Sequence, residues 1–464
     1  MQIYELYEII LIFAYLETIF TTMTYIKILA KMAAALALVA VTAGCDWIFP
    51  DRGCKVDEES RKVLLLYSAG HNSLRSYLLD DIKDLRQGWL PGNGCNDDIL
   101  LVYTHTSSKN GSYSQPSTPY LIRLYRDKEG TAVSDTLVTY EAGTVSSSAL
   151  QINNVLTYIK ENYTSGSYGM IFSSHATGYL PAGFYKDPGS YTFAAEGMMK
   201  SHGTGRSGGR FGIPSPVPYI EPEHDPSLPM VKSIGEDRVG SGSSQISYEM
   251  DLPDFAEAIP MKLDYLLFDA CLMGGIEAAY ELSGKVGKLG FSQAEVLAEG
   301  LDYKTLTSRL LQNETPDPES VCDDYFAQYD SESGVYRSAT ISLIDCDRLE
   351  PLAEICRRLF STYREAIASA DHSAVQRFFR YDKHWFYDLE SILTEAGISS
   401  GDLKELHSAL DQCVIYKGHT PEFMNEFDIH TFSGFSMYLP SNGHPELEKF
   451  YKTLKWNKAT GLVE

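Results

Sequence analysis

Continuous apolar segments that alternate with amphipathic helical patterns constrain the fold of this chain more than any other feature of its sequence. Four of these segments have the length of buried strands: KVLLLY at 62–67, DILLVYT at 98–104, YGMIFSS at 168–174 and DYLLFD at 264–269. Helical patterns lie between them, for example at residues 148–163. Strands without polar alternation are typical of a mainly parallel sheet with helices on both faces. We therefore predict an α/β fold.

The pattern of elements changes near residue 310. Residues 120–125 (YLIRLY) are predicted to continue the first sheet. Beyond residue 310, helices are predicted at 352–366, 372–379 and 401–413, and strands at 338–344 and 432–439. The sequence thus predicts one domain over residues 61–309 and an α+β region over residues 310–464. Residues 185–247, rich in Gly, Ser and Pro and without a sustained period, are predicted to be a long insertion in the first domain.

The segment from Met23 to Cys45 has the layout of a bacterial export signal, in which two lysines precede an apolar run. The run is too short to span a bilayer, which takes ~20 residues. It ends in TAGC at 42–45, which resembles a lipobox, so Cys45 is the predicted lipidation site. Because threonine replaces the usual leucine, a plain secretory signal is the alternative. We expect residues 1–45 to be a leader with its true start at Met23, and residues 46–60 to be a tether.

This layout predicts a protein that is exported and held at the bacterial cell envelope by a lipid, facing the periplasm or the cell surface. It would be secreted if Cys45 is not used. The formal net charge of −23, from 39 basic and 62 acidic residues, disfavours nucleic acid as a partner because a phosphate backbone would be repelled. The eight cysteines show no C-x-x-C pair, so a structural zinc site is not indicated.

Two of the predicted strands end in residues that are suited to nucleophilic catalysis. SSHATGY at 173–179 and DACLMG at 269–274 each follow a buried strand directly. His175 and Cys271, leaving neighbouring parallel strands at one edge, can come within hydrogen-bond reach, as a thiolate and its general acid require. A helix predicted to begin near Met273 would favour the thiolate. Taken alone, however, a strand-end cysteine is more often a small buried apolar residue, and a lone histidine a hydrogen-bonded turn residue.

These two motifs resemble the histidine and cysteine turns of the clostripain family of cysteine peptidases, relatives of caspases, gingipains and legumains. Further similar motifs follow in order: YSAGHNSL at 67–74, FSQAE at 291–295, GLDY at 300–303, ATISLID at 339–345 and SGFSMYLP at 433–440. The resemblance covers most of residues 61–464. It implies a caspase-like fold with Cys271 as nucleophile, His175 as acid/base partner, and an oxyanion hole formed by the backbone N–H groups of Ala176 and Cys271.

Three features depart from the family pattern: Ala176 replaces a glycine, Tyr179 replaces a tryptophan, and the interval between histidine and cysteine carries the long insertion. The resemblance implies that Asp269 helps form an acidic pocket for the arginine or lysine before the cleaved bond, the P1 residue. A carboxylate pairs readily with such a cation. The alternative is that Asp269 caps the following helix.

Members of the family are often matured by cleavage between the histidine and the cysteine. The basic residues of the insertion that are candidates for such cleavage are Lys200, Arg206, Arg210, Lys232 and Arg238. The alternative is a surface loop that contains basic residues and is not cleaved. No cofactor is expected. Some relatives require calcium, and the nearby carboxylates are Glu295, Glu299 and Asp302, but no EF-hand pattern supports a metal site and none is assigned.

The resulting expectation is an exported cysteine endopeptidase that cleaves proteins or peptides after arginine or lysine through a Cys–His dyad and a thioester acyl-enzyme. No third residue that orients the histidine can be assigned from sequence. The alternatives are a surface lipoprotein that uses the same fold as a catalytically weak or inactive binding module, and a transpeptidase. The presence of both His175 and Cys271 favours the enzyme.

Overall fold

A computed structural model describes residue 57 and residues 59–107, 113–114, 116–194, 211–220, 225–232 and 236–464. The predicted leader, with Met23 and Cys45, and most of the predicted tether lie outside these residues. Within the described part of the chain, no helix combines the length and the apolar character that a membrane span demands.

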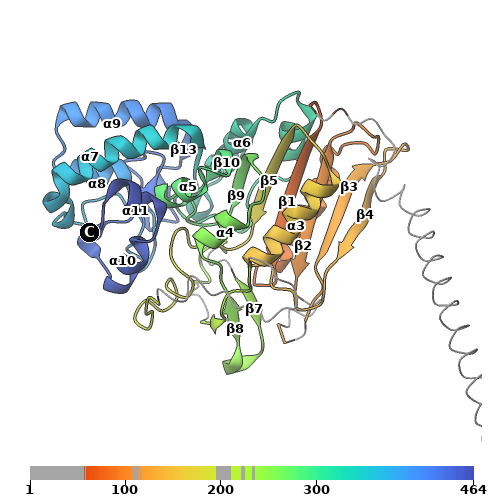
Figure 1. Cartoon of the computed structure of the whole chain (residues 1–464), viewed down its shortest axis with the longest axis horizontal. Coiled ribbons are helices and arrows are strands. Elements are labelled where there is room, and N and C mark those ends of the chain that lie inside the picture. The colour runs from red at the N-terminus through yellow and green to blue at the C-terminus, as the bar shows by residue number, and fades with distance from the viewer. Residues whose placement is uncertain are drawn as a thin grey trace, which may run out of the picture. The chain divides into compact units, whose positions relative to one another are not determined.

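A nine-stranded sheet lies at the centre of the protein (Figure 1), in the order β13-β11-β10-β9-β5-β1-β2-β3-β4. Its five central strands are parallel: β1 (Lys62–Gly70), β2 (Ile99–Thr106), β5 (Ser167–Ser173), β9 (Leu263–Asp269) and β10 (Val286–Phe291). Antiparallel strands extend both edges: β3 (Tyr120–Arg126) and β4 (Ala132–Thr139) on one side, β11 (Thr340–Asp345) and β13 (Val414–His419) on the other. The prediction of a mainly parallel α/β fold is confirmed.

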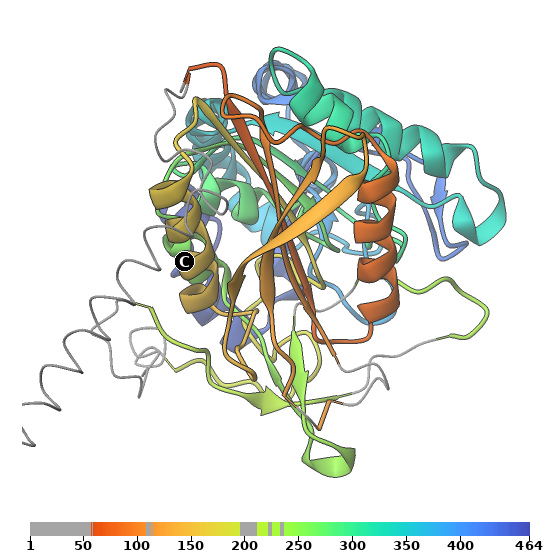
Figure 2. The ribbon, with the colours of Figure 1, turned by 90° about the vertical axis from the view of Figure 1, so that its right-hand side faces the viewer.

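Helices cover both faces of this sheet, as the edge-on view of Figure 2 shows for α2 (Arg75–Gln87) and α3 (Ala149–Asn162). The side chain of Ser148 caps α3 by accepting the Gln151 N–H at 3.2 Å, as serine does at helix N-termini. α4 (Leu252–Ala258) lies next to α3, and α5 (Ile276–Leu282) lies next to α4. α6 (Pro318–Asp330) packs on β11 and β13.

The C-terminal part of the chain extends the same sheet and adds a group of helices. The longest is α7 (Leu349–Ala368), which packs against α9 (Ser400–Cys413) and α11 (Lys455–Thr460), and α11 also contacts α5. The shorter elements are α8 (Leu389–Glu395), α10 (Pro445–Tyr451), β12 (Tyr387–Asp388), β14 (Glu422–Phe423), β15 (Phe427–Asp428) and β16 (Ser436–Met437). In the insertion, β6 (Val217–Pro218), β7 (Asp237–Val239) and β8 (Ile246–Tyr248) form a small sheet.

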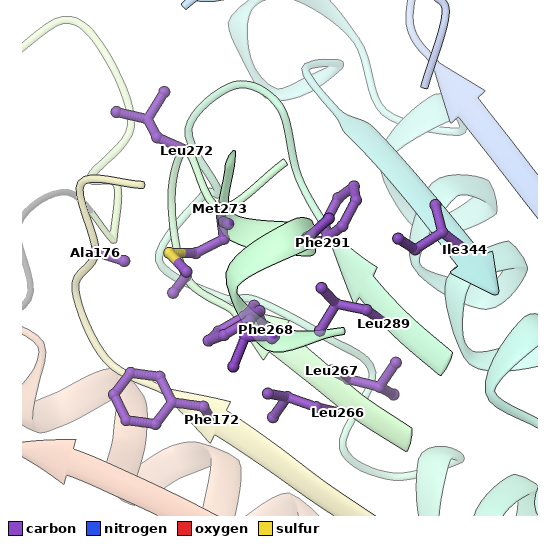
Figure 3. Close-up of a cluster of buried hydrophobic side chains, with 14 of the residues drawn as sticks. Phe172, Ala176, Leu266, Leu267, Phe268, Leu272, Met273, Leu289, Phe291 and Ile344 are labelled. Atoms are coloured by element: carbon purple, nitrogen blue, oxygen red, sulfur yellow. The ribbon is translucent and has the colours of Figure 1, made fainter. Parts of the chain in front are cut away.

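Apolar side chains fill the core beneath the carboxyl ends of the central strands (Figure 3). Phe172 of β5, Leu266 and Phe268 of β9, and Leu289 and Phe291 of β10 are all nearly inaccessible to solvent. Burying aliphatic and aromatic side chains on this scale is the dominant favourable term in folding. The strand ends, and the turns that follow them, are therefore held on a rigid base.

Two predictions of local structure were wrong, and one predicted helix begins later than expected. Residues 372–379 form no helix, although Val375, Phe378 and Phe379 are buried at helical spacing. Here the chain follows tertiary contacts instead, because the Phe378 N–H donates to the Phe386 carbonyl at 2.9 Å. The strand expected at 432–439 is reduced to β16, since Gly434 has a φ of +99° that interrupts extended backbone. The helix expected near Met273 begins only at Ile276.

Candidate active site

His175 and Cys271 leave neighbouring strands at the same edge of the sheet. Ser173 of β5 pairs with Asp269 of β9 in parallel register. His175 lies two positions after Ser173, and Cys271 lies two positions after Asp269. His175 is 4% exposed and Cys271 is fully buried. The strand ends that were predicted from apolar patterning therefore bring the two residues to one place, beyond the carboxyl ends of the strands, where ligands bind in open α/β sheets.

The thiol of Cys271 is held by the chain that follows β10. The Val296 N–H donates to Cys271 Sγ at 3.0 Å, and the sulfur lies 3.6 Å from the Val296 carbonyl oxygen. Burial raises the pKa of Cys271 well above its ordinary value, and the Glu295 carboxylate raises it further, against the lowering effects of the Val296 N–H and nearby cations. In this closed arrangement the sulfur is a neutral thiol, not the thiolate that a nucleophile requires.

His175 has a hydrogen-bond partner that the sequence did not reveal. Its Nε2 lies 3.1 Å from Ser73 Oγ, in the turn after β1. Its Nδ1 is buried and has no hydrogen-bond partner among the described residues. Burial lowers the pKa of His175 to about 3, so the ring is neutral. Ser73 could have been proposed as a neighbour of His175, because β1 is the parallel neighbour of β5 and ends at the same edge of the sheet.

The two predicted oxyanion donors converge on a single atom, the carbonyl oxygen of Lys232. The Ala176 N–H donates to this oxygen at 3.3 Å and the Cys271 N–H donates to it at 3.4 Å. Two backbone N–H groups aimed at one carbonyl oxygen are the arrangement that stabilises developing negative charge in acyl transfer. The Lys232 carbonyl oxygen thus accepts hydrogen bonds from both predicted oxyanion donors.

The side chain of Lys232 fills a closed pocket beside the cysteine. Its ammonium donates to Asp269 and, at 3.2 Å, to Ser173 Oγ, and it is fully buried. Burial opposes the ammonium form, but the nearby carboxylates outweigh burial and raise the pKa of Lys232. Tyr303 donates its hydroxyl to Asp269 at 2.7 Å. One wall is Gly300, at a φ of +66°, where a Cβ atom would lie only 2.5 Å from Lys232 Nζ.

The backbone around Lys232 pairs with the strand-like segment that carries Val296. The Lys232 N–H donates to the Val296 carbonyl at 2.8 Å, and the Ala298 N–H donates to the Met230 carbonyl at 2.9 Å. Val231 and Leu297 form an antiparallel bridge between these bonds. This is the pairing by which an extended peptide adds to an exposed backbone edge, with alternate side chains directed into pockets.

Asp269 lies in the pocket and does not cap the following helix. The N-cap position of α5 belongs to Gly275, six residues further along the chain. Both Asp269 and the lysine that it binds are fully buried, so their charges are neutralised by one another and not by water.

Arg380, from the C-terminal half of the chain, contacts a residue of this site. Its guanidinium forms a buried, bidentate ion pair with Glu295, the residue before Val296. No local sequence pattern indicated this pair, because 85 residues separate its members. Among the described residues there is no group of three or more His, Cys, Asp or Glu side chains placed to hold a metal ion. The expectation that no cofactor is needed stays a prediction, and no calcium ligands are assigned.

The chain downstream of Lys232 is anchored from residue 236 onward. Lys186 binds Glu236 and lies 3.3 Å from Glu249. Asp237 accepts the backbone N–H of Ser147 at 3.2 Å, and burial raises the pKa of Asp237 to about 7. Of the predicted cleavage candidates, Lys200, Arg206 and Arg210 lie outside the described residues. The guanidinium of Arg238 lies over the ring of Tyr219, with Cζ 3.8 Å from the ring centroid.

Comparisons with known proteins identify relatives of this arrangement. A sequence profile described as the clostripain family matches residues 66–187 and 226–461. Two similar solved structures are an inactive zymogen C11 protease from Parabacteroides distasonis and a secreted C11 cysteine protease from Bacteroides thetaiotaomicron in complex with an irreversible peptide inhibitor. The first is 24% identical, with a TM-score of 0.66 over 87% of this chain and 98% of that one. The second is 23% identical, with a TM-score of 0.64 over 87% and 99%. No curated protein gives a significant match.

Proposed function

Because the chain belongs to the clostripain family of cysteine peptidases, we propose that it is an endopeptidase that cleaves after arginine or lysine, with Cys271 as nucleophile and His175 as acid/base partner. One observation carries the proposal. Lys232 directs its ammonium to Asp269 while both Ala176 and Cys271 donate their N–H groups to its carbonyl oxygen. A basic P1 residue of a substrate would occupy the same positions.

The proposed mechanism is acyl transfer. The Cys271 thiol transfers its proton to His175, and the thiolate forms a bond to the carbonyl carbon after the P1 residue. The oxyanion that develops accepts hydrogen bonds from the N–H groups of Ala176 and Cys271. The carbon–nitrogen bond breaks as His175 donates its proton to the leaving amine. Water, deprotonated by His175, then attacks the thioester carbon. The carbon–sulfur bond breaks, the Cys271 thiolate takes the proton back from His175, and the product leaves as a carboxylic acid that ionises in water.

In this mechanism Ser73 is a positioning residue. Its hydroxyl lies 3.1 Å from His175 Nε2. In the tautomer that this mechanism needs, the proton is on Nε2 and the serine oxygen accepts it, so that the lone pair of the neutral ring is on Nδ1. The hydrogen bond made by one ring nitrogen sets the protonation of the other. Nδ1 is thereby available to accept the thiol proton.

We propose further that the described arrangement is a closed precursor and that Lys232 is its internal substrate. Hydrolysis of the bond between Lys232 and Ser233 would release the segment paired with Val296 and open the pocket. Support comes from the neutral states of the thiol and of the imidazole, whose pKa values are shifted by burial in opposite directions. Solvation of the opened site would reverse both shifts.

We also propose that the protein is exported and lipid-anchored at the bacterial cell envelope through Cys45, on the periplasmic or the outer face, and that it is secreted if Cys45 is not acylated. This proposal depends on the TAGC motif and the apolar run before it. Mass spectrometry of the mature protein tests it: a diacylated cysteine at the new N-terminus is expected, and an unmodified N-terminus downstream of Cys45 would contradict the anchor.

The enzymatic proposal is tested with fluorogenic peptides that carry arginine or lysine at P1 and with an arginyl acyloxymethyl ketone. Hydrolysis and covalent labelling are expected, and both should be lost in Cys271→Ala. Cys346→Ala is the matched control, because it removes another buried free cysteine. If trypsin-treated protein neither hydrolyses these peptides nor takes up the label, the peptidase proposal fails and the binding-module alternative takes its place.

A further inference from the structure

A second carboxylate lies at the end of the pocket that holds Lys232. Asp81 belongs to α2, and it is one of the three residues that this helix buries, with Leu78 and Leu85. It is 6% exposed. Its Oδ2 lies 3.7 Å from Lys232 Nζ. The pocket therefore presents two carboxylates from two different elements, Asp269 from the end of β9 and Asp81 from the helix that packs on β1.

A lysine side chain does not satisfy both carboxylates. The ammonium is bound by Asp269 and Ser173, whereas 3.7 Å is beyond hydrogen-bond distance to Asp81. Among the described residues, Asp81 Oδ2 has no hydrogen-bond partner. Burial raises the pKa of Asp81 to about 8, despite the nearby ammonium. A buried polar atom without a protein partner is costly unless a ligand group, an ion or a water molecule reaches it.

An arginine side chain matches this spacing better. Its guanidinium has two terminal nitrogens in a rigid fork, and these lie one covalent bond, about 1.3 Å, beyond the position that corresponds to lysine Nζ. One terminal nitrogen can donate to Asp269 while the other crosses the gap to Asp81. Charge-assisted hydrogen bonds to two carboxylates are the geometry for which arginine is selected over lysine.

We infer that Asp81 is a specificity-determining residue that makes this pocket select arginine over lysine at P1. The inference deepens the proposed function and rests on it, since it takes the Lys232 pocket to be the P1 pocket. Lys232 is then a weaker occupant than the arginine of a substrate. A lysine at the internal position closes the pocket with an ion pair but no hydrogen bond to Asp81, so an arginine side chain competes with it favourably.

The test compares two peptides that differ only in P1, arginine or lysine, on fully processed enzyme, with trypsin removed and trypsin-treated Cys271→Ala as the blank. Wild type is expected to show a kcat/KM about tenfold or more higher for arginine, from one added charge-assisted hydrogen bond. Asp81→Asn is expected to reduce this ratio to within about threefold of unity, mainly by loss on the arginine peptide. Asp80→Asn is the matched control: Asp80 is exposed on the same helix, 3.4 Å from Lys83, and should leave the ratio unchanged.

Inhibition of the wild-type enzyme by side-chain mimics needs no variant, so this measurement does not depend on whether Asp81→Asn folds. Propylguanidine is expected to inhibit at about one tenth of the concentration that butylamine requires. A wild-type preference for lysine, equal inhibition by the two mimics, or an unchanged ratio in folded Asp81→Asn would overturn the inference. Hydrolysis of neither peptide, with no labelling of Cys271, would instead refute the proposed function, so the two failures are distinguishable.

Discussion

Replacing Lys232 by methionine tests the closed arrangement most directly. Methionine keeps most of the apolar stem but removes the ammonium, so Asp269 and Asp81 are left facing one another without a cation. The docked segment should then leave the pocket, because the Asp269 carboxylate regains water when it does. Cys271, which is fully buried while Lys232 is docked, becomes accessible.

The size of the effect follows from the burial of the pair. Lys232 and Asp269 are both fully buried, and removing one partner of such a pair costs about 3–5 kcal/mol. If this cost falls on the docked state alone, the ratio of open to closed protein rises by about a hundredfold to a few thousandfold, at about 1.4 kcal/mol for each factor of ten. The rate at which the site can be labelled rises by the same factor until the site is fully open.

The assay is the rate at which an arginyl acyloxymethyl ketone labels Cys271, read by intact mass so that only uncleaved chains are compared. Lys262→Met is the matched control, because the Lys262 side chain is 60% exposed and its ion pair with Asp347 is loose. The pKa of Lys232 is raised in the folded protein. The ammonium therefore stabilises the docked state fully below about pH 10.4, and this stabilisation is lost as the pH rises through the folded-state pKa. The advantage of the variant should therefore shrink at high pH.

The reasoning would be refuted if intact Lys232→Met were labelled no faster than intact wild type. In that case the ammonium contributes nothing to closure, and the contacts between Met230 and Ala298 or the anchored segment beyond residue 236 hold the site closed.

Two further predictions concern residues that support the site. Ser73→Ala should lower kcat by about two- to tenfold with little change in KM, because one hydrogen bond that orients His175 is lost. Ser73→Thr, which keeps the hydroxyl, should restore kcat. A change in KM alone would contradict a positioning role. Arg380→Met should lower the free energy of unfolding by about 3–5 kcal/mol in chemical denaturation, because it leaves the buried Glu295 carboxylate without its partner. Adding Glu295→Gln to this variant should recover part of the loss. Strictly additive losses in the double variant would contradict the pairing.

The parts of the fold that sequence predicted well are those in which burial alone sets the pattern. β1, β2, β5 and β9 lie between helices and are covered on both faces, so each contains a continuous run of apolar side chains. β4 was missed because it is an edge strand with mostly half-buried and exposed residues, and such a strand has no distinctive pattern. The apolar spacing at 375–379 predicted a helix, yet the same side chains are buried here by irregular backbone.

Sequence by itself determined the chemistry available at this site, because His175, Cys271 and Asp269 directly follow or end buried strands, and neighbouring parallel strands must end at a common edge. It could not determine what surrounds them. Ser73, Asp81, Lys232 and Arg380 come from four separate segments of the chain, and no local pattern relates them. Only the tertiary structure decided that an internal lysine fills the pocket between two carboxylates, because hydrogen bonds and ion pairs depend on distances in space, which strand register and helix packing set.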